Sequence, residues 1–311
     1  MTQPVFEYSR TFYTDQVADM IHSRFPEYED RIAVGIAGEG SDCFGYDDLM
    51  SRDHDFGTGV CLWITDSDME EFGRLLSIAY NELIDSQPGN RLTDRLRARR
   101  GVMTVQDFYS NILGIDCDTA NCRITDEQWM KLDHACLATA VNGAVFRDDL
   151  GEFSRFRKLL KDYYPDKIWR RRIADELHRF SAALQVNYAR CMTRGDRVAA
   201  ELCRLEGIES AMQLFFLLKR EYPPYYKWTY RRLAEIDDDG RFATLISRLS
   251  ECGINREAWA GKEYSGDYLN LTDRTVFNTE EIAAHLVSMM RKMGLIDNSA
   301  PYLEKHVDEV L

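Results

Sequence analysis

The chain of 311 residues carries 52 acidic against 39 basic side chains, which give a formal net charge of −13. This charge repels a nucleic-acid backbone and argues against general nucleic-acid binding, whereas a nucleotide carried with a divalent cation is compatible with it. Hydrophobic residues make up 45% of the chain, as expected for a globular protein of one large domain or two ordinary ones.

The cysteines and the apolar runs bear on the cellular compartment of the protein. The eight cysteines form no CxxC pair and no regular framework, which is typical of proteins in reducing compartments. No apolar run approaches the roughly 18 residues that a membrane span requires, and the first residues lack the pattern of an export signal. We therefore expect a cytoplasmic protein with no membrane partner.

The first 150 residues mix helical and strand patterns. Apolar residues at helical spacing predict a leading helix over residues 8–25, and a similar stripe predicts a helix over residues 66–84. Four short apolar runs predict strands: RIAVGIAG, FGTGVCLWIT, GVMTVQDF and NGAVFRDDLG.

Long helical patterns take over after Gly151, interrupted by Pro165, by YPPYY at 222–226 and by Gly240. They predict helices near residues 152–164, 166–192, 196–221, 225–238, 240–253, 279–294 and 300–310. The predicted fold class is α+β, with a small mixed sheet and flanking helices in residues 1–150 and an all-α helical bundle in residues 151–311.

The stretch GEGSDCFGYDDLMSRDHDFG, residues 38–57, contains two aspartates that could bind a metal. In an extended chain Asp53 and Asp55 point to one face and His54 to the other. Two adjacent carboxylates repel each other unless a cation lies between them, and paired oxygen ligands suit Mg²⁺. The alternative is an acidic loop open to water.

The same stretch begins with a glycine-rich turn after a predicted strand. Gly40 lets backbone N–H groups approach an anion closely, and Ser41 adds a hydroxyl donor. The turn therefore predicts a phosphate site, with an ordinary connecting turn as the alternative. Asp47 and Asp48 fit a turn better than a metal site.

The order of strand, Gly-Ser turn and DxD before a second strand resembles the signature of the nucleotidyltransferase superfamily. Four blocks also resemble, in order, a bacterial family catalogued as domain of unknown function 4037: the stretch above, NGAVFRDDLGEFSRFRKLL, QVNYARCMTRGD and PPYYKWTYRRL. The likeness spans roughly residues 8–255. It implies that Gly40 and Ser41 hold a triphosphate and that Asp53 and Asp55 hold the metal.

Enzymes of this superfamily usually carry a third carboxylate, as metal ligand or general base. Asp148 in VFRDD is the first candidate, and Asp149 and Asp107 are alternatives. The competing role for Asp148 is that of a turn residue or helix cap.

The helical half adds further candidates for nucleotide binding. Lys227 and Arg231 lie four residues apart beside Trp228, so that cations could meet phosphate and a ring could stack on a base or sugar. Tyr188 offers a similar contact. The alternative is packing between the two domains, with the aromatic rings buried and the cations neutralising the acidic loop. The basic run DRLRARR, residues 94–100, is interpreted as a solvated face.

Together these patterns predict a nucleotidyltransferase that uses Mg²⁺ or Mn²⁺. It would move a nucleoside monophosphate from a nucleoside triphosphate, such as ATP, to a hydroxyl of a small molecule or protein. The predicted catalytic residues are Asp53, Asp55 and Asp148. The alternative is a non-catalytic nucleotide-binding or interaction module with the same fold.

Overall fold

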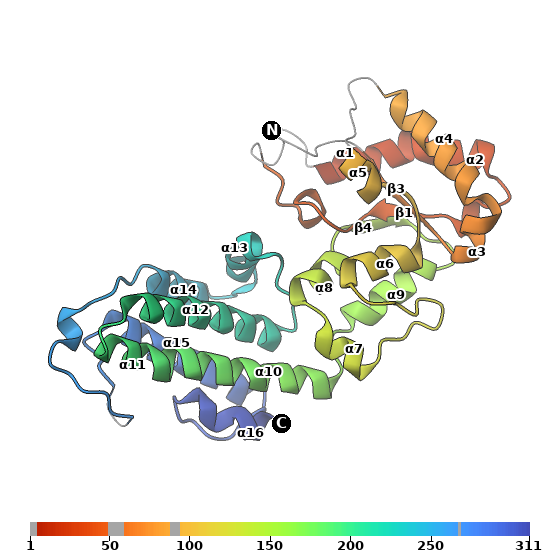
Figure 1. The fold of residues 1–311 in the computed structure, drawn as a ribbon. Helices are drawn as coiled ribbons and strands as arrows, with labels where there is room; N and C mark the ends of the chain where they lie inside the picture. Colours follow the sequence, from red (N-terminus) through yellow and green to blue (C-terminus); the bar gives the residue numbers. More distant parts are fainter. Residues whose placement is uncertain (1–4, 49–58, 88–93, 267–268) are drawn as a thin grey trace. The chain divides into compact units, whose positions relative to one another are not determined.

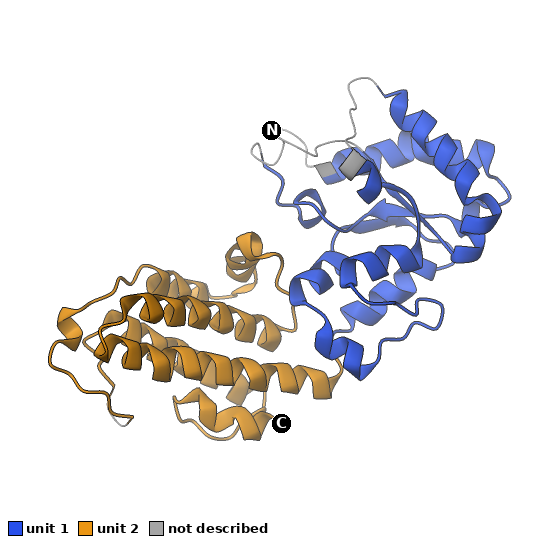
Figure 2. Ribbon diagram, viewed as in Figure 1, with its two compact units in different colours: residues 1–163 blue, residues 164–311 orange. Residues whose placement is uncertain are grey.

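The computed structural model describes residues 5–48, 59–87, 94–266 and 269–311. The chain divides into two compact units, residues 1–163 and 164–311, which Figure 2 colours separately. The boundary predicted after residue 150 precedes helix α9 (Glu152–Lys161). Because Phe153 of this helix stacks on Trp63 of the sheet, with 3.7 Å between ring centroids, α9 completes the first core and the division follows it.

A four-stranded mixed sheet forms the centre of the first unit (Figure 1). The order is β3-β2-β1-β4, in which β2 and β3 are parallel and the other neighbours antiparallel. The strands are β1 (Ala33–Ile36), β2 (Cys61–Ile64), β3 (Gly101–Thr104) and β4 (Ala144–Arg147). This sheet, with the helical second unit, confirms the predicted α+β class.

The third strand is shorter than GVMTVQDF predicted. Helix α6 (Val105–Leu113) begins directly after Thr104, whose side-chain oxygen accepts a hydrogen bond from the Asp107 N–H at 2.9 Å. A threonine in this position caps a helix start, so the chain leaves the sheet there.

Alternating side chains of the strands face two helical layers. Val34 and Leu62 belong to a core with residues of the helices that precede β1 and follow β2. On the other face Trp63 packs edge-on against Phe108, with 5.4 Å between centroids. The remaining helices of this unit are α1 (Val5–Phe12), α2 (Ala18–Arg24), α3 (Asp66–Asp68), α4 (Arg74–Asp85), α5 (Asp94–Arg99), α7 (Asp126–Lys131) and α8 (His134–Val141), with a π-helical turn (Tyr13–Val17) between the first two.

Helices form the second unit, and its described residues contain no strand. Phe215 and Phe242 stack in its core with 4.5 Å between centroids. The helices are α10 (Asp166–Phe180), α11 (Tyr188–Thr193), α12 (Arg197–Lys219), α13 (Tyr226–Ile236), α14 (Arg241–Ser250), α15 (Arg274–Lys292) and α16 (Val307–Val310), with a π-helical segment (Ser181–Asn187) joining the first two.

Two predicted helices differ from the observed ones. Helix α15 begins before residue 279, because Asp273 caps it by accepting a hydrogen bond from the Thr275 N–H at 2.7 Å. The helix predicted over 300–310 is a 3₁₀ turn (Leu303–His306) followed by α16. In the described parts of the chain, no helix combines the length and apolar character needed to cross a membrane.

Candidate functional site

Strand register gathers several segments at one end of the sheet. Strand β1 leads into the turn Gly38–Ser41. Antiparallel pairing of Gly35 with Cys61 puts the start of β2 beside the end of β1, and parallel pairing of Cys61 with Gly101 adds the start of β3. Strand β4 also begins at this end (Figure 1). We call it the turn end of the sheet.

The side chain of Asn142 fixes the first residue of the turn. The Gly38 N–H donates to Asn142 Oδ1, and Asn142 Nδ2 donates to the Gly38 carbonyl, both at 2.8 Å. Gly38 and Gly40 have φ values of +101° and +127°, a backbone conformation that glycine adopts without steric cost. The Asn142 hydrogen bonds and the two glycines therefore fix the backbone of the turn, which is neither helix nor strand.

The rest of the turn presents hydrogen-bond donors. Ser41 starts a 3₁₀ turn (Asp42–Phe44), but its side chain makes no capping hydrogen bond. Among the residues that the structure describes, neither the N–H groups of Gly40 and Ser41 nor Ser41 Oγ has a hydrogen-bonding partner. Consecutive backbone donors of this kind form sites for anions.

A buried arginine holds the turn from behind. Arg100 is 3% exposed, and its guanidinium donates to Asp42 Oδ2 at 2.8 Å and to the Ala37 carbonyl at 3.3 Å. Burial lowers the pKa of Arg100, but the neighbouring Cys43, Cys61 and Asp42 raise it well above its ordinary value. Arg100 therefore stays charged inside the unit, and the interpretation of its basic run as a solvated face is wrong for this residue.

The preceding arginine contacts the turn from the solvent side. Arg99 Nη2 lies 2.7 Å from a carboxylate oxygen of Glu39, between the two glycines. The Arg99 side chain is 19% exposed and that of Glu39 is 62% exposed. Neither arginine was predicted as a site residue; the available signal was two arginines directly before a strand.

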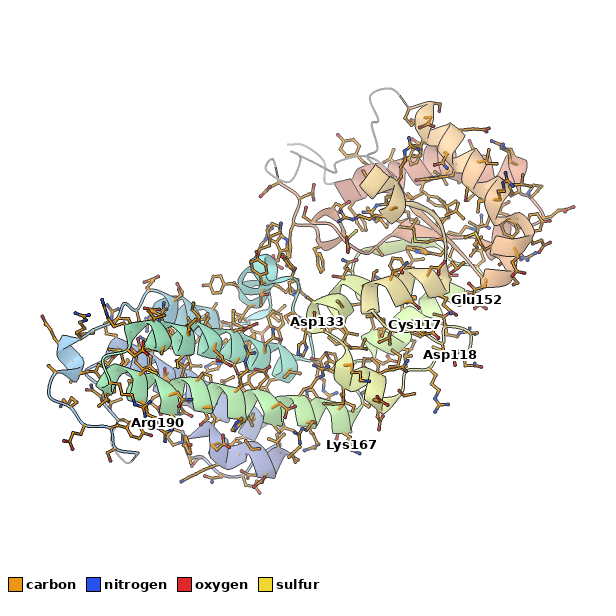
Figure 3. All side chains as sticks on the ribbon, in the orientation of Figure 1. Cys117, Asp118, Asp133, Glu152, Lys167 and Arg190 are labelled. Atoms are coloured by element: carbon orange, nitrogen blue, oxygen red, sulfur yellow. The ribbon has the colours of Figure 1, made fainter. Side chains whose placement is uncertain are left out.

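Asp148 lies away from the turn. In the antiparallel pair of β1 and β4, Arg147 faces Val34, so Asp148 follows at the opposite end of the sheet. Its carboxylate accepts a hydrogen bond from the Ser154 N–H at 2.7 Å and caps α9. Figure 3 labels Glu152 at the start of that helix, on this opposite side. The structure therefore does not bring Asp148 to the turn end, and its cap role accounts for its position.

The alternative third carboxylates also follow the far ends of their strands. Asp107 follows Thr104, the last residue of β3, which lies at the same far end. Asp149 forms an ion pair with Arg147. None of the three candidates for the third carboxylate therefore lies at the turn end.

Asp53 and Asp55 lie outside the described residues. The chain resumes at Gly59, where an added Cβ would come within 3.3 Å of Arg100 Cβ, so Gly59 lies at the turn end. In the described part of the chain, no three His, Cys, Asp or Glu side chains are arranged to hold a metal ion.

Helix α13 in the second unit carries the predicted cations and ring. Lys227 and Arg231 are exposed, and their charged groups lie 5.3 and 5.7 Å from the Trp228 ring centroid. Arg231 also pairs with Glu235 at 3.4 Å. The grouping is thus present on a surface, and its contact with a nucleotide stays a prediction.

Tyr188, in contrast, belongs to the core. Its side chain is fully buried, and its hydroxyl donates to Asp273 Oδ2 at 3.1 Å. Trp259 Nε1 donates to the same oxygen at 2.6 Å. The prediction of a nucleotide contact is wrong for Tyr188, because a buried ring that packs beside Trp259 offers no face to a ligand.

Residues 129–229 match the model of a protein family described as a domain of unknown function, DUF4037. The match confirms the resemblance over this range, which contains the NGAVFRDDLGEFSRFRKLL and QVNYARCMTRGD blocks. It does not include the turn Gly38–Ser41 or the two aspartates, so the likeness to nucleotidyltransferases stays a prediction. No curated protein and no solved structure is significantly similar to the chain.

Proposed function

We propose that this protein is a nucleotidyltransferase that uses Mg²⁺ or Mn²⁺. It moves a nucleoside monophosphate from a nucleoside triphosphate to a hydroxyl of a small molecule or protein. The observation that carries the proposal is the strand register at the turn end. That register brings the Gly38–Ser41 turn to the end of the sheet at which β2 begins, and Asp53 and Asp55 precede β2 in the sequence.

Each group at this end has a chemical task in the proposal. The N–H groups of Gly40 and Ser41, with Ser41 Oγ, bind phosphate oxygens and orient the triphosphate. Asp53 and Asp55 have the hard oxygen donors that Mg²⁺ prefers, and the ion supplies positive charge for the leaving pyrophosphate. Fixed donors of this kind stabilise charge that develops during the reaction.

A second function, nucleotide binding without turnover, has one observation in its favour. Asp148 and Asp107 lie at the far end of the sheet. The nearest described carboxylates at the turn end, Glu39 and Asp42, each contact an arginine. A module that binds a nucleotide through the turn and the metal would need no additional base.

The release of pyrophosphate separates these two functions. The full chain is incubated with each of the four nucleoside triphosphates, Mg²⁺ or Mn²⁺, and a panel of hydroxyl acceptors that includes protein. We expect release that the double variant Asp53→Asn, Asp55→Asn abolishes. The matched control is Asp47→Asn, Asp48→Asn in the same stretch, which we expect to keep the activity. Tight nucleotide binding with no release would favour the second function.

A further inference from the structure

The ion pair between Arg99 and Glu39 assigns a second anion contact to the turn. We propose that Arg99 binds the triphosphate and that Glu39 competes with the nucleotide for its guanidinium. The inference rests on the proposed function, because it names a substrate-binding residue for the same site.

The backbone of Arg99 is fixed at the turn end. It is the last residue of α5, and its carbonyl oxygen accepts a hydrogen bond from Cys61 Sγ at 3.3 Å. Two residues later, the Gly101 N–H donates to the Val60 carbonyl at 2.9 Å. Both contacts join this segment to the start of β2. The Arg99 side chain therefore begins from a fixed point and reaches the turn.

The two arginines differ in what they can offer a ligand. Arg100 is buried, and Asp42 and the Ala37 carbonyl use its guanidinium. Arg99 is partly exposed, and among the described residues it pairs with one carboxylate, that of Glu39. A guanidinium has five N–H donors in a planar fork, so most of its donors stay available to a second anion.

Phosphate is the stronger partner for this guanidinium. The Glu39 side chain is 62% exposed, and an ion pair with so exposed a partner contributes little. A triphosphate carries more charge and accepts the paired hydrogen bonds that arginine makes best. The Arg99 guanidinium contacts Glu39, the residue that directly precedes Gly40, so Arg99 lies beside the turn whose N–H groups would bind the phosphates.

Helix α5 offers a matched control. Arg97, two residues before Arg99, forms an ion pair with Asp85 at 2.5 Å. That pair joins α5 to α4 and does not involve the turn. It has the same charges and a comparable exposure, with side chains 35% and 62% exposed.

The test measures affinity for α,β-methylene nucleoside triphosphates with Mg²⁺ by calorimetry, using the base that the unmodified protein binds best. We expect Arg99→Ala to weaken binding about tenfold or more, since it removes charged hydrogen bonds. We expect Glu39→Gln to tighten binding about two- to fivefold, since it removes a competing ion pair. Arg97→Ala should bind like the unmodified protein.

Competition predicts opposite changes in nucleotide affinity for Arg99→Ala and Glu39→Gln. A loss of folding would instead weaken nucleotide binding in both variants. Glu39→Gln should give no gain when Arg99 is already alanine. If the unmodified protein binds nucleotide and Arg99→Ala binds equally well, or if Glu39→Gln weakens binding, the inference is wrong and the proposed function stands. If the unmodified protein binds none of the four nucleotides, both are wrong.

Discussion

The neighbouring residues Arg99 and Arg100 have the same side chain but different surroundings and different roles. Arg100 points into the unit and neutralises Asp42, whereas Arg99 points outward to Glu39. The run DRLRARR contains both, and its composition does not distinguish them. The difference arises because Arg100 directly precedes β3, whose register brings it beside the turn.

The buried pair leads to a prediction for stability. Arg100→Met leaves the Asp42 carboxylate and the Ala37 carbonyl without their buried partner. We expect the free energy of unfolding to fall by about 3–5 kcal/mol, the usual cost of breaking a buried pair. Urea unfolding measures this, with Arg97→Met as the control, expected to lose at most about 1 kcal/mol. Equal losses for the two variants would contradict the structural role given to Arg100.

A second prediction concerns Glu176 in α10. Burial raises the pKa of this carboxyl, and its Oε2 atom, which lies 3.6 Å from Arg179 Nη1, has no hydrogen-bonding partner among the described residues. The folded protein then holds the proton more tightly than the unfolded chain. Its contribution to stability is full below the unfolded pKa and is lost as the pH rises through the folded pKa.

Replacing this carboxyl removes that dependence. We expect Glu176→Gln to raise the melting temperature at pH 8, and the gain to shrink as the pH falls toward 5. The exposed Glu82→Gln serves as the control. A gain of the same size at both pH values would show that burial of the charge is not its cause.

At the scale of elements, the pairing of β1 with β4 depends on a glycine. Gly143 has a φ of +66°, and a Cβ there would lie 1.9 Å from the Ile36 carbonyl oxygen. Its N–H also donates to the Cys43 carbonyl at 2.9 Å. The start of β4 and the turn that follows β1 are therefore packed backbone against backbone.

The glycine at this contact can be compared with one in open space. Gly45 has a similar φ of +69° but nothing within 4 Å of an added Cβ. We expect Gly45→Ala to cost about 1 kcal/mol from backbone strain. Gly143→Ala should cost at least about 3 kcal/mol, since its strain comes with a backbone clash. Chemical unfolding of the two variants measures the difference, and equal costs would contradict the described β1–β4 contact.

Local patterns predicted the elements but not the directions of the strands. The glycine-rich turn after β1 and the long helices of the second unit follow from apolar spacing and from glycine or proline signals. Asp148 was misplaced because no local pattern shows that β4 runs antiparallel to β1. Arg100 and Asn142 were missed for the same reason. They lie about 60 and 100 residues from the turn in sequence and meet it only because the strands pair. Local sequence patterns do not contain such long-range contacts.

Tyr188 shows a second limit of prediction from sequence, which concerns burial. Its neighbours in QVNYARCMTRGD include two arginines, and the block suggests a polar surface. Its burial depends on Trp259 and Asp273, which lie far along the chain. An aromatic residue beside cations is therefore as consistent with a core as with a ligand surface until its partners are known.

At the scale of the whole molecule, the net charge of −13 limits the partners. We expect no binding of a labelled duplex DNA at 150 mM KCl, with a Kd weaker than about 100 μM, because the protein repels the phosphate backbone. Fluorescence anisotropy measures this. Binding in the micromolar range that weakens with salt would show that basic residues form a surface strong enough to overcome the net charge.

The central claim is that the turn end of the sheet holds a metal-bound nucleoside triphosphate. A crystal structure of the full chain with an α,β-methylene nucleoside triphosphate and Mg²⁺ tests it most directly. We predict phosphate oxygens within hydrogen-bonding distance of the Gly40 and Ser41 N–H groups, with Mg²⁺ bound by Asp53 and Asp55. A nucleotide bound elsewhere, with the Gly40 and Ser41 donors making no contact to it, would contradict the claim.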